Sequence, residues 1–296
     1  MSQILLHFGL AKTATTYLQR YVFPTASSVN YVGKPIADPP GRVVQFLERT
    51  FGMYPTRSDY FDYFYDHEDD LRFKDYNDLN HTNLVERWRH LLSRNELNVW
   101  SHEGYIRPGR KSSPLDRNKA LANIIRACRD AGCTDIRALV VLRETRSMMA
   151  SYAIQFHRDF NYLQIDDCAF SDLQKYIAGD LDNQFLRLMW RLWYQYFDYT
   201  ALVNDLDFHF GEQNVSIVKY EELENNWNLV EEILQKQDPE VRCQFPKTRE
   251  NESKNKSYIL SPQILSYLDR LKNVDIENLY PENATLVEQR KFTLKR

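Results

Sequence analysis

The sequence is poor in glycine and cysteine, and it has neither a long hydrophobic run nor a large excess of one charge. Its 296 residues include 9 glycines and 4 cysteines, and the formal net charge is -3. A membrane-spanning helix needs about 18 or more consecutive apolar residues, and no such stretch occurs. The near-neutral balance argues against a protein that binds nucleic acid through a broad basic surface. We therefore expect no membrane span and no nucleic-acid partner.

The cysteines also lack the spacing of a metal site or a redox motif. Cys128, Cys133, Cys168 and Cys243 form no CxxC pair and no zinc pattern. The N-terminal segment MSQILLHFGLAKT has no basic region before its short apolar stretch, which is unlike a signal peptide. These features predict reduced thiols, no metal and a cytoplasmic location.

Short apolar runs alternate with longer segments of helical periodicity. The expected strands are Ile4–Phe8, Leu97–Ser101, Ile136–Leu142 and Val215–Val218. The expected helices are Thr15–Phe23, Leu84–Leu92, Leu121–Cys128, Arg143–Phe156, Asp182–Tyr199, Glu222–Leu234 and Pro262–Leu271, and Thr25–Pro40 is rich in turn formers. This alternation predicts a three-layer α/β/α fold with a central parallel sheet. We expect a single domain over 1–296, with insertions around 25–83 and 158–183.

Ligands of such folds bind at the carboxyl ends of the strands, and polar residues gather there. The first strand is followed by Gly9-Leu-Ala-Lys12-Thr13-Ala14-Thr15-Thr16. Free backbone N–H groups at a strand-to-helix turn hold anions, and a lysine and hydroxyls add charge and donors. The Walker A pattern of Mg-dependent nucleotide triphosphatases is absent. The third strand is followed by Arg143, with Ser151 eight residues on, a pair suited to a second phosphate.

Taken together, these segments resemble the sulfotransferases that use 3'-phosphoadenosine 5'-phosphosulfate (PAPS). The family's first loop reads Lys-[Ser/Thr]-Gly-Thr-Thr, and its second element is a strand-end Arg with a Ser eight residues later. A third element, strand-Tyr-Glu-[Asp/Glu]-Leu, matches Tyr220 and the three residues after it. The opening HFGLAKTATTYLQ is most similar to bacterial members. Ala14 departs from the pattern, because the family usually has Gly there.

The resemblance implies a P-loop-like fold and a role for each matched position. Lys12, Thr13, Ala14, Thr15 and Thr16 would bind the 5'-phosphosulfate of PAPS, and Lys12 would stabilise the charge on the leaving phosphate. Arg143 and Ser151 would bind the 3'-phosphate, and Tyr220 would contact the adenine. The product would be 3'-phosphoadenosine 5'-phosphate (PAP), and the reaction would need no metal.

Transfer to a hydroxyl also needs a base at another strand end, and two neighbours qualify. Glu103 fits the Ser-x-Glu pattern of bacterial relatives, and His102 fits the Ser-His pattern of cytosolic ones. Neighbours in a strand point to opposite faces, so one of them is expected to face the sulfuryl group, and Glu103 is favoured. His7, beside the loop, is a weaker third candidate and is better suited to holding the loop in shape.

The acceptor remains open in the sequence. Aromatic residues between Phe51 and Tyr65 suit either a sugar-stacking wall or a packed helix pair, and the basic stretch 107–111 suits either an anionic acceptor group or a solvated loop. We expect a carbohydrate or small-metabolite hydroxyl. A Mg-dependent kinase or nucleotidase and a non-catalytic nucleotide- or glycan-binding module are the alternatives, and the oligomeric state is undetermined.

Overall fold

A computed structural model describes residues 2–10, 13–33, 71–79, 81–106, 116–148, 150 and 198–245, with residues 81–84, 87 and 103 described by their backbone alone. The chain divides into two compact units. The first comprises Met1–Leu142 and Val203–Thr248, and the second comprises Arg143–Leu202 and Arg249–Arg296. The sheet and most of the described helices belong to the first unit, and the prediction of a single domain stays a prediction.

The first unit is built on a parallel sheet with the strand order β2-β3-β1-β4-β5. Its strands are β1 (Ser2–Gly9), β2 (Val29–Tyr31), β3 (Leu97–Glu103), β4 (Cys133–Leu142) and β5 (Val215–Lys219). Every strand expected from the sequence is present. The short edge strand β2 was not expected, because it lies inside the turn-rich stretch 25–40. β3 runs two residues further than predicted, so His102 and Glu103 belong to the strand itself.

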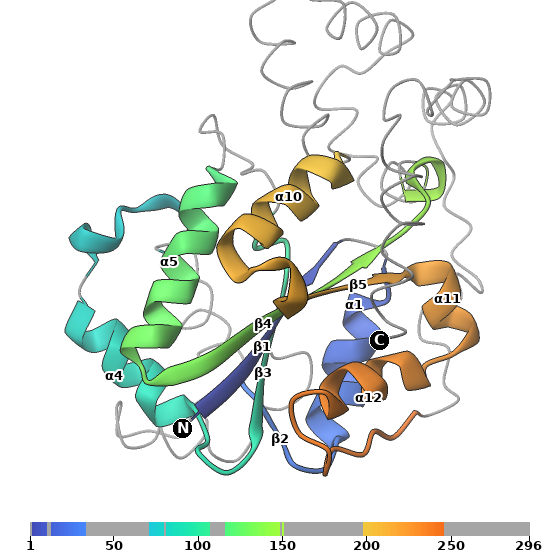
Figure 1. Cartoon of the computed structure of the whole chain (residues 1–296), viewed down its shortest axis with the longest axis horizontal. Coiled ribbons are helices and arrows are strands. Elements are labelled where there is room, and N and C mark those ends of the chain that lie inside the picture. Colours follow the sequence, from blue (N-terminus) through green and yellow to red (C-terminus); the bar gives the residue numbers. More distant parts are fainter. Residues whose placement is uncertain are drawn as a thin grey trace, which may run out of the picture. The chain divides into compact units, whose positions relative to one another are not determined.

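Helices cover both faces of the sheet, which confirms the predicted α/β/α class. Figure 1 shows α4 (His81–Leu91) and α5 (Arg117–Asp130) on one side, with α1 (Thr15–Tyr17) and α12 (Asn228–Gln235) on the other. β1 is buried on both faces, so its alternate side chains meet different layers. The Phe8 side chain packs with Trp100, while that of His7 meets Phe23 in the layer of α1.

Aromatic rings fill the core beneath α4 and α5. The centroid of Phe8 lies 5.9 Å from that of Trp100 and 6.0 Å from that of Phe210, the last residue of α10 (Tyr199–Phe210). The ring of Trp100 also lies 5.1 Å from Tyr105, whose hydroxyl donates to the Ala120 carbonyl in α5. The core therefore accounts for part of the high aromatic content.

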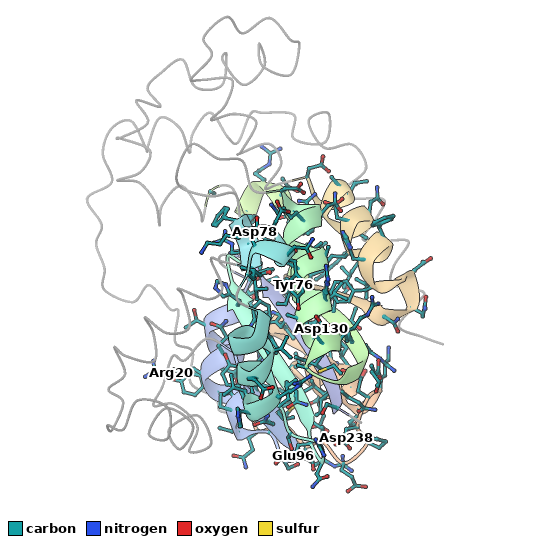
Figure 2. All side chains as sticks on the ribbon, turned by 90° about the vertical axis from the view of Figure 1, so that its left-hand side faces the viewer. Arg20, Tyr76, Asp78, Glu96, Asp130 and Asp238 are labelled. Carbon is teal, nitrogen blue, oxygen red and sulfur yellow. The ribbon has the colours of Figure 1, made fainter. Side chains whose placement is uncertain are left out.

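A polar contact joins the short 3-10 helix η3 (Tyr76–Asp78) to the end of α5. The Tyr76 hydroxyl donates to Asp130 Oδ2 at 2.8 Å, and the guanidinium of Arg126 lies over the tyrosine ring at 4.5 Å from its centroid. Figure 2 labels Tyr76 and Asp130 side by side. Burial, and secondarily the hydrogen bond to Asp130, raises the pKa of Tyr76. This contact holds η3 against the C-terminal end of α5.

The observed helices modify several of the predicted ones. The helix expected over Thr15–Phe23 is α1 followed by a π-helical turn, η1 (Leu18–Val22), and a 3-10 turn, η2 (Phe23–Thr25). The helix expected over Glu222–Leu234 is wrong in its continuity, because it is divided into α11 (Tyr220–Asn225) and α12. The helix α10 was not expected. Half of 143–156, residues 182–197 and all of 262–271 lie outside the described residues.

Candidate functional site

The carboxyl ends of the parallel strands lie at one edge of the sheet, and two of them meet at the start of the candidate phosphate loop. In the register of β1 and β3, Gly9 pairs with Glu103. The N–H of Gly104 donates to the carbonyl of Gly9 at 3.2 Å. The strand end that carries the candidate base therefore adjoins the first residue of the loop. Tyr220 follows β5, begins α11 and is half-buried.

Two threonine hydroxyls close the loop from inside. Thr13 Oγ1 donates to the carbonyl of Leu10 at 2.8 Å, and Thr15 Oγ1 donates to the same carbonyl at 3.1 Å. Both threonines are buried, whereas Thr16 is half-buried at the loop surface. A hydroxyl has a single proton to donate, so these two shape the loop in this conformation. Of the three threonines, Thr16 is the most exposed.

Ala14 holds the loop in the conformation that glycine usually supplies. Its φ is 60° and its ψ is 12°, in the left-handed region. The motif that the sequence resembles usually has Gly at this place, and glycine adopts the left-handed region without strain. Gly9 is constrained in a different way, because a Cβ atom there would lie 2.3 Å from Thr15 Cγ2. The loop thus combines a strained residue with a close approach between its two ends.

The helix that follows the loop begins without a side-chain cap. Ala14 occupies the N-cap position and has no side-chain acceptor, and the first turn contains no acidic residue. The first N–H groups of a helix have no partner within the helix and attract anions. The start of this helix is therefore compatible with a bound anionic group.

A buried polar network joins the strand before the loop, the helical turn after it and β3. His7 Nδ1 is 2.7 Å from Ser101 Oγ, and Gln19 Nε2 donates to the same oxygen at 2.9 Å. Desolvation by burial lowers the pKa of His7 to about 3, so its imidazole is neutral at ordinary pH. This placement suits a residue that supports the loop and the neighbouring strand.

His102 lies on the opposite face of β3 from Ser101. Its ring stacks on Trp100 at 5.7 Å between centroids and meets Tyr105 at 5.8 Å. Its side chain is only 3% exposed. A base must reach the acceptor proton within hydrogen-bond distance, and the assignment of this role to Glu103 stays a prediction. Glu103 is placed by its backbone pairing with Gly9.

The remaining candidate residues are described separately or lie outside the described residues. Arg143 directly follows β4, is half-buried and belongs to the second unit. The Glu144 carboxylate beside it accepts the N–H groups of Arg146 and Ser147 at 2.8 and 2.7 Å, which caps the helix that begins there. Lys12, Ser151, the Phe51–Tyr65 aromatic cluster and the basic stretch 107–111 lie outside the described residues.

Sequence reasoning missed the contributions of Gln19 and Ser101. Their signal was a polar residue inside an otherwise apolar helix face and inside an apolar strand. Both positions are buried, and a buried polar side chain usually has a specific partner. That signal identifies unusual positions, but it does not say that the two residues contact each other.

The comparisons with known proteins give one solved structure to report. The chain is similar to a sulfotransferase from Alicyclobacillus acidocaldarius over 80% of this chain and 80% of that chain, with 15% identity and a TM-score of 0.41. No protein-family model and no curated protein matches the chain.

The described residues were also searched for membrane spans. None of the helices in these parts of the chain combines the length and the apolar character that crossing a bilayer requires.

Proposed function

We propose that this protein is a sulfotransferase that moves a sulfuryl group from PAPS to a hydroxyl of a carbohydrate or small metabolite. The observation that carries the proposal is the pairing of Gly9 with Glu103, which puts a candidate base at the start of a loop suited to phosphate. The resemblance in the three motifs supports the same activity. Lys12, Arg143, Ser151 and Tyr220 are assigned to the donor by the resemblance alone.

The proposed reaction is an in-line displacement at sulfur. The acceptor oxygen forms a bond to sulfur while the bond from sulfur to the 5'-phosphate oxygen breaks. The acceptor proton passes to Glu103, and the electron pair of the broken bond stays on the phosphate of PAP. Lys12 and the N–H groups of residues 13–16 stabilise the charge that develops on the leaving phosphate. The sulfuryl group and the proton are thus both accounted for.

Binding of PAP in the absence of metal tests the donor assignment. At a hundred times its dissociation constant, a ligand stabilises the folded state by about 2.7 kcal/mol, so the thermal transition rises measurably. A Mg²⁺-dependent shift with ATP and none with PAP would instead favour a kinase or nucleotidase. PAP binding without any transfer would favour a binding module.

Transfer of radiolabelled sulfate from PAPS to a panel of monosaccharides, disaccharides and phenols tests the catalytic assignments. Lys12→Ala should lower transfer by about 10²–10³-fold, as expected for loss of a group that stabilises developing charge. Lys236→Ala, at an exposed position after α12, is the matched control and should retain activity. Glu103→Gln should lower transfer by about 10²–10⁴-fold. Full activity of Glu103→Gln with loss in His102→Ala would identify His102 as the base.

A further inference from the structure

Three polar side chains are buried together between β1, β3 and the π-helical turn η1. His7, Ser101 and Gln19 are 0%, 0% and 1% exposed. His7 Nδ1 lies 2.7 Å from Ser101 Oγ, and Gln19 Nε2 donates both to that oxygen at 2.9 Å and to the Ser101 carbonyl at 3.2 Å. The network therefore holds Ser101 by its side chain and its backbone at once.

The surrounding backbone restricts Ser101 further. A Cβ atom on Gly33, just after β2, would lie 2.3 Å from the Ser101 N atom and 2.7 Å from its carbonyl oxygen. Gln19 reaches the strand from a π-helical turn, and such turns occur frequently at functional sites. Ser101 is thus enclosed by His7 of β1, Gln19 of η1 and Gly33 after β2. It lies two residues before Glu103 in β3.

This network does not serve stability in an obvious way. Among the described residues, neither His7 Nε2 nor Gln19 Oε1 has a hydrogen-bond partner, although both atoms are buried. Buried polar atoms without partners cost stability, and well-packed apolar side chains often replace such groups without loss. Apolar side chains would hold η1 against the sheet equally well. The stability of the fold therefore does not explain why polar residues occupy these three positions.

The position of the network supplies that reason. Gln19 belongs to the helical segment that starts directly after the loop, and Ser101 belongs to the strand that ends at the candidate base. We propose that His7, Ser101 and Gln19 are positioning residues that couple the loop 10–16 to the carboxyl end of β3. Seating of the donor nucleotide on the loop then fixes the strand end that carries Glu103. This inference rests on the proposed function, and it assigns a role to three residues that do not touch the reacting atoms.

Hydrogen–deuterium exchange with and without PAP tests this coupling independently of the acceptor. In the wild-type protein, PAP should slow amide exchange at residues 101–104 by about tenfold, within the usual range of coupling between sites. Gln19→Met keeps the length of the side chain but removes its donor. This variant should still bind PAP, as measured by calorimetry, and should lose most of the slowing at 101–104.

Gln237→Met is the matched control, because Gln237 is also buried and lies after α12. The PAP effect on residues 101–104 should be the same in this variant as in the wild type. Ser101→Ala, which removes one oxygen atom, provides a second test should Gln19→Met fail to fold, and it should lose the slowing as well. A thermal transition of Gln19→Met at or above that of the wild type is also expected.

The outcomes separate the two proposals. Full PAP-dependent slowing at residues 101–104 in both Gln19→Met and Ser101→Ala would overturn the positioning role and leave the proposed function intact. Equal loss of slowing in Gln237→Met would also overturn it, because the effect would then be a general consequence of altered packing. Failure of the wild-type protein to bind PAP overturns the proposed function and this inference with it.

Discussion

At the scale of single residues, Ala14 adopts a backbone conformation that favours glycine. Its left-handed backbone, with φ of 60°, places the alanine Cβ close to the neighbouring carbonyl oxygen. That conformation costs a non-glycine residue roughly 1–2 kcal/mol. The sequence showed the departure from the motif, and the backbone angles show that Ala14 is left-handed.

Ala14→Gly should therefore stabilise the protein. We expect the free energy of unfolding to rise by about 1 kcal/mol, since the relief of strain exceeds the entropic cost of glycine. Urea unfolding measures the change. Ala122→Gly is the matched control, because Ala122 is exposed within α5, and there glycine should lower stability by about 1 kcal/mol. A loss of stability in both variants would show that the strain at Ala14 is negligible.

His7 links the buried network to the pH dependence of stability. Burial lowers its pKa from the ordinary histidine value of about 6.5 to about 3. Between these two values the unfolded chain binds a proton that the folded protein does not. The stability of the folded state therefore decreases as the pH falls below about 6.5.

Comparison with His7→Asn isolates this effect. From pH 7 to pH 5, the stability of the wild type relative to the variant should fall by about 2 kcal/mol. Urea unfolding of both proteins at each pH gives the difference directly. A difference that stays constant over this range would mean that His7 titrates normally in the folded state.

At the scale of helices and strands, the spacing of apolar residues in the sequence predicted those elements that have an apolar face. The spacing of apolar residues predicted α4 and α5, and the apolar runs predicted the strands of the sheet interior. The helix α10 was missed although Leu202, Val203 and Leu206 follow helical spacing and are buried. The helical spacing of α10 is therefore present in the sequence.

The break between α11 and α12 has a local cause. Asn226 is not helical, with φ of -147° and ψ of 87°, and its N–H still bonds to carbonyls of α11. Its Oδ1 accepts the N–H of Asn228 at 3.2 Å. Asparagine side chains compete with the helical backbone for hydrogen bonds in this way. Because the apolar periodicity continues across Asn226, the pattern predicted one helix where the structure has two. The π-helical turn η1 is also a local feature of the chain. It directs Gln19 onto Ser101, a contact that the spacing of apolar residues does not indicate.

The strand order can be tested with two valines of unequal burial. Val140 in β4 is 0% exposed, whereas Val29 lies half-buried in the edge strand β2. Val140→Ala should lower the free energy of unfolding by about 2 kcal/mol, because it leaves a cavity in the core. Val29→Ala should cost about 1 kcal/mol or less. Equal losses in urea unfolding would contradict the placement of β2 at the edge.

At the scale of the whole molecule, the sequence by itself determined the α/β class, the positions of the interior strands and the three motifs that point to a sulfotransferase. These follow from local features, namely apolar runs, helical spacing and residue types at strand ends. They require no knowledge of which strands are neighbours.

Only the tertiary structure decided which of these strand ends lie together. The register that pairs Gly9 with Glu103, and the network of His7, Gln19 and Ser101, join residues separated by more than 80 positions in the chain. Such contacts depend on strand order and packing, which hydrophobic periodicity does not encode. For the same reason, the sequence did not show that His102 packs against the rings of Trp100 and Tyr105, and the choice of Glu103 as the base stays a prediction.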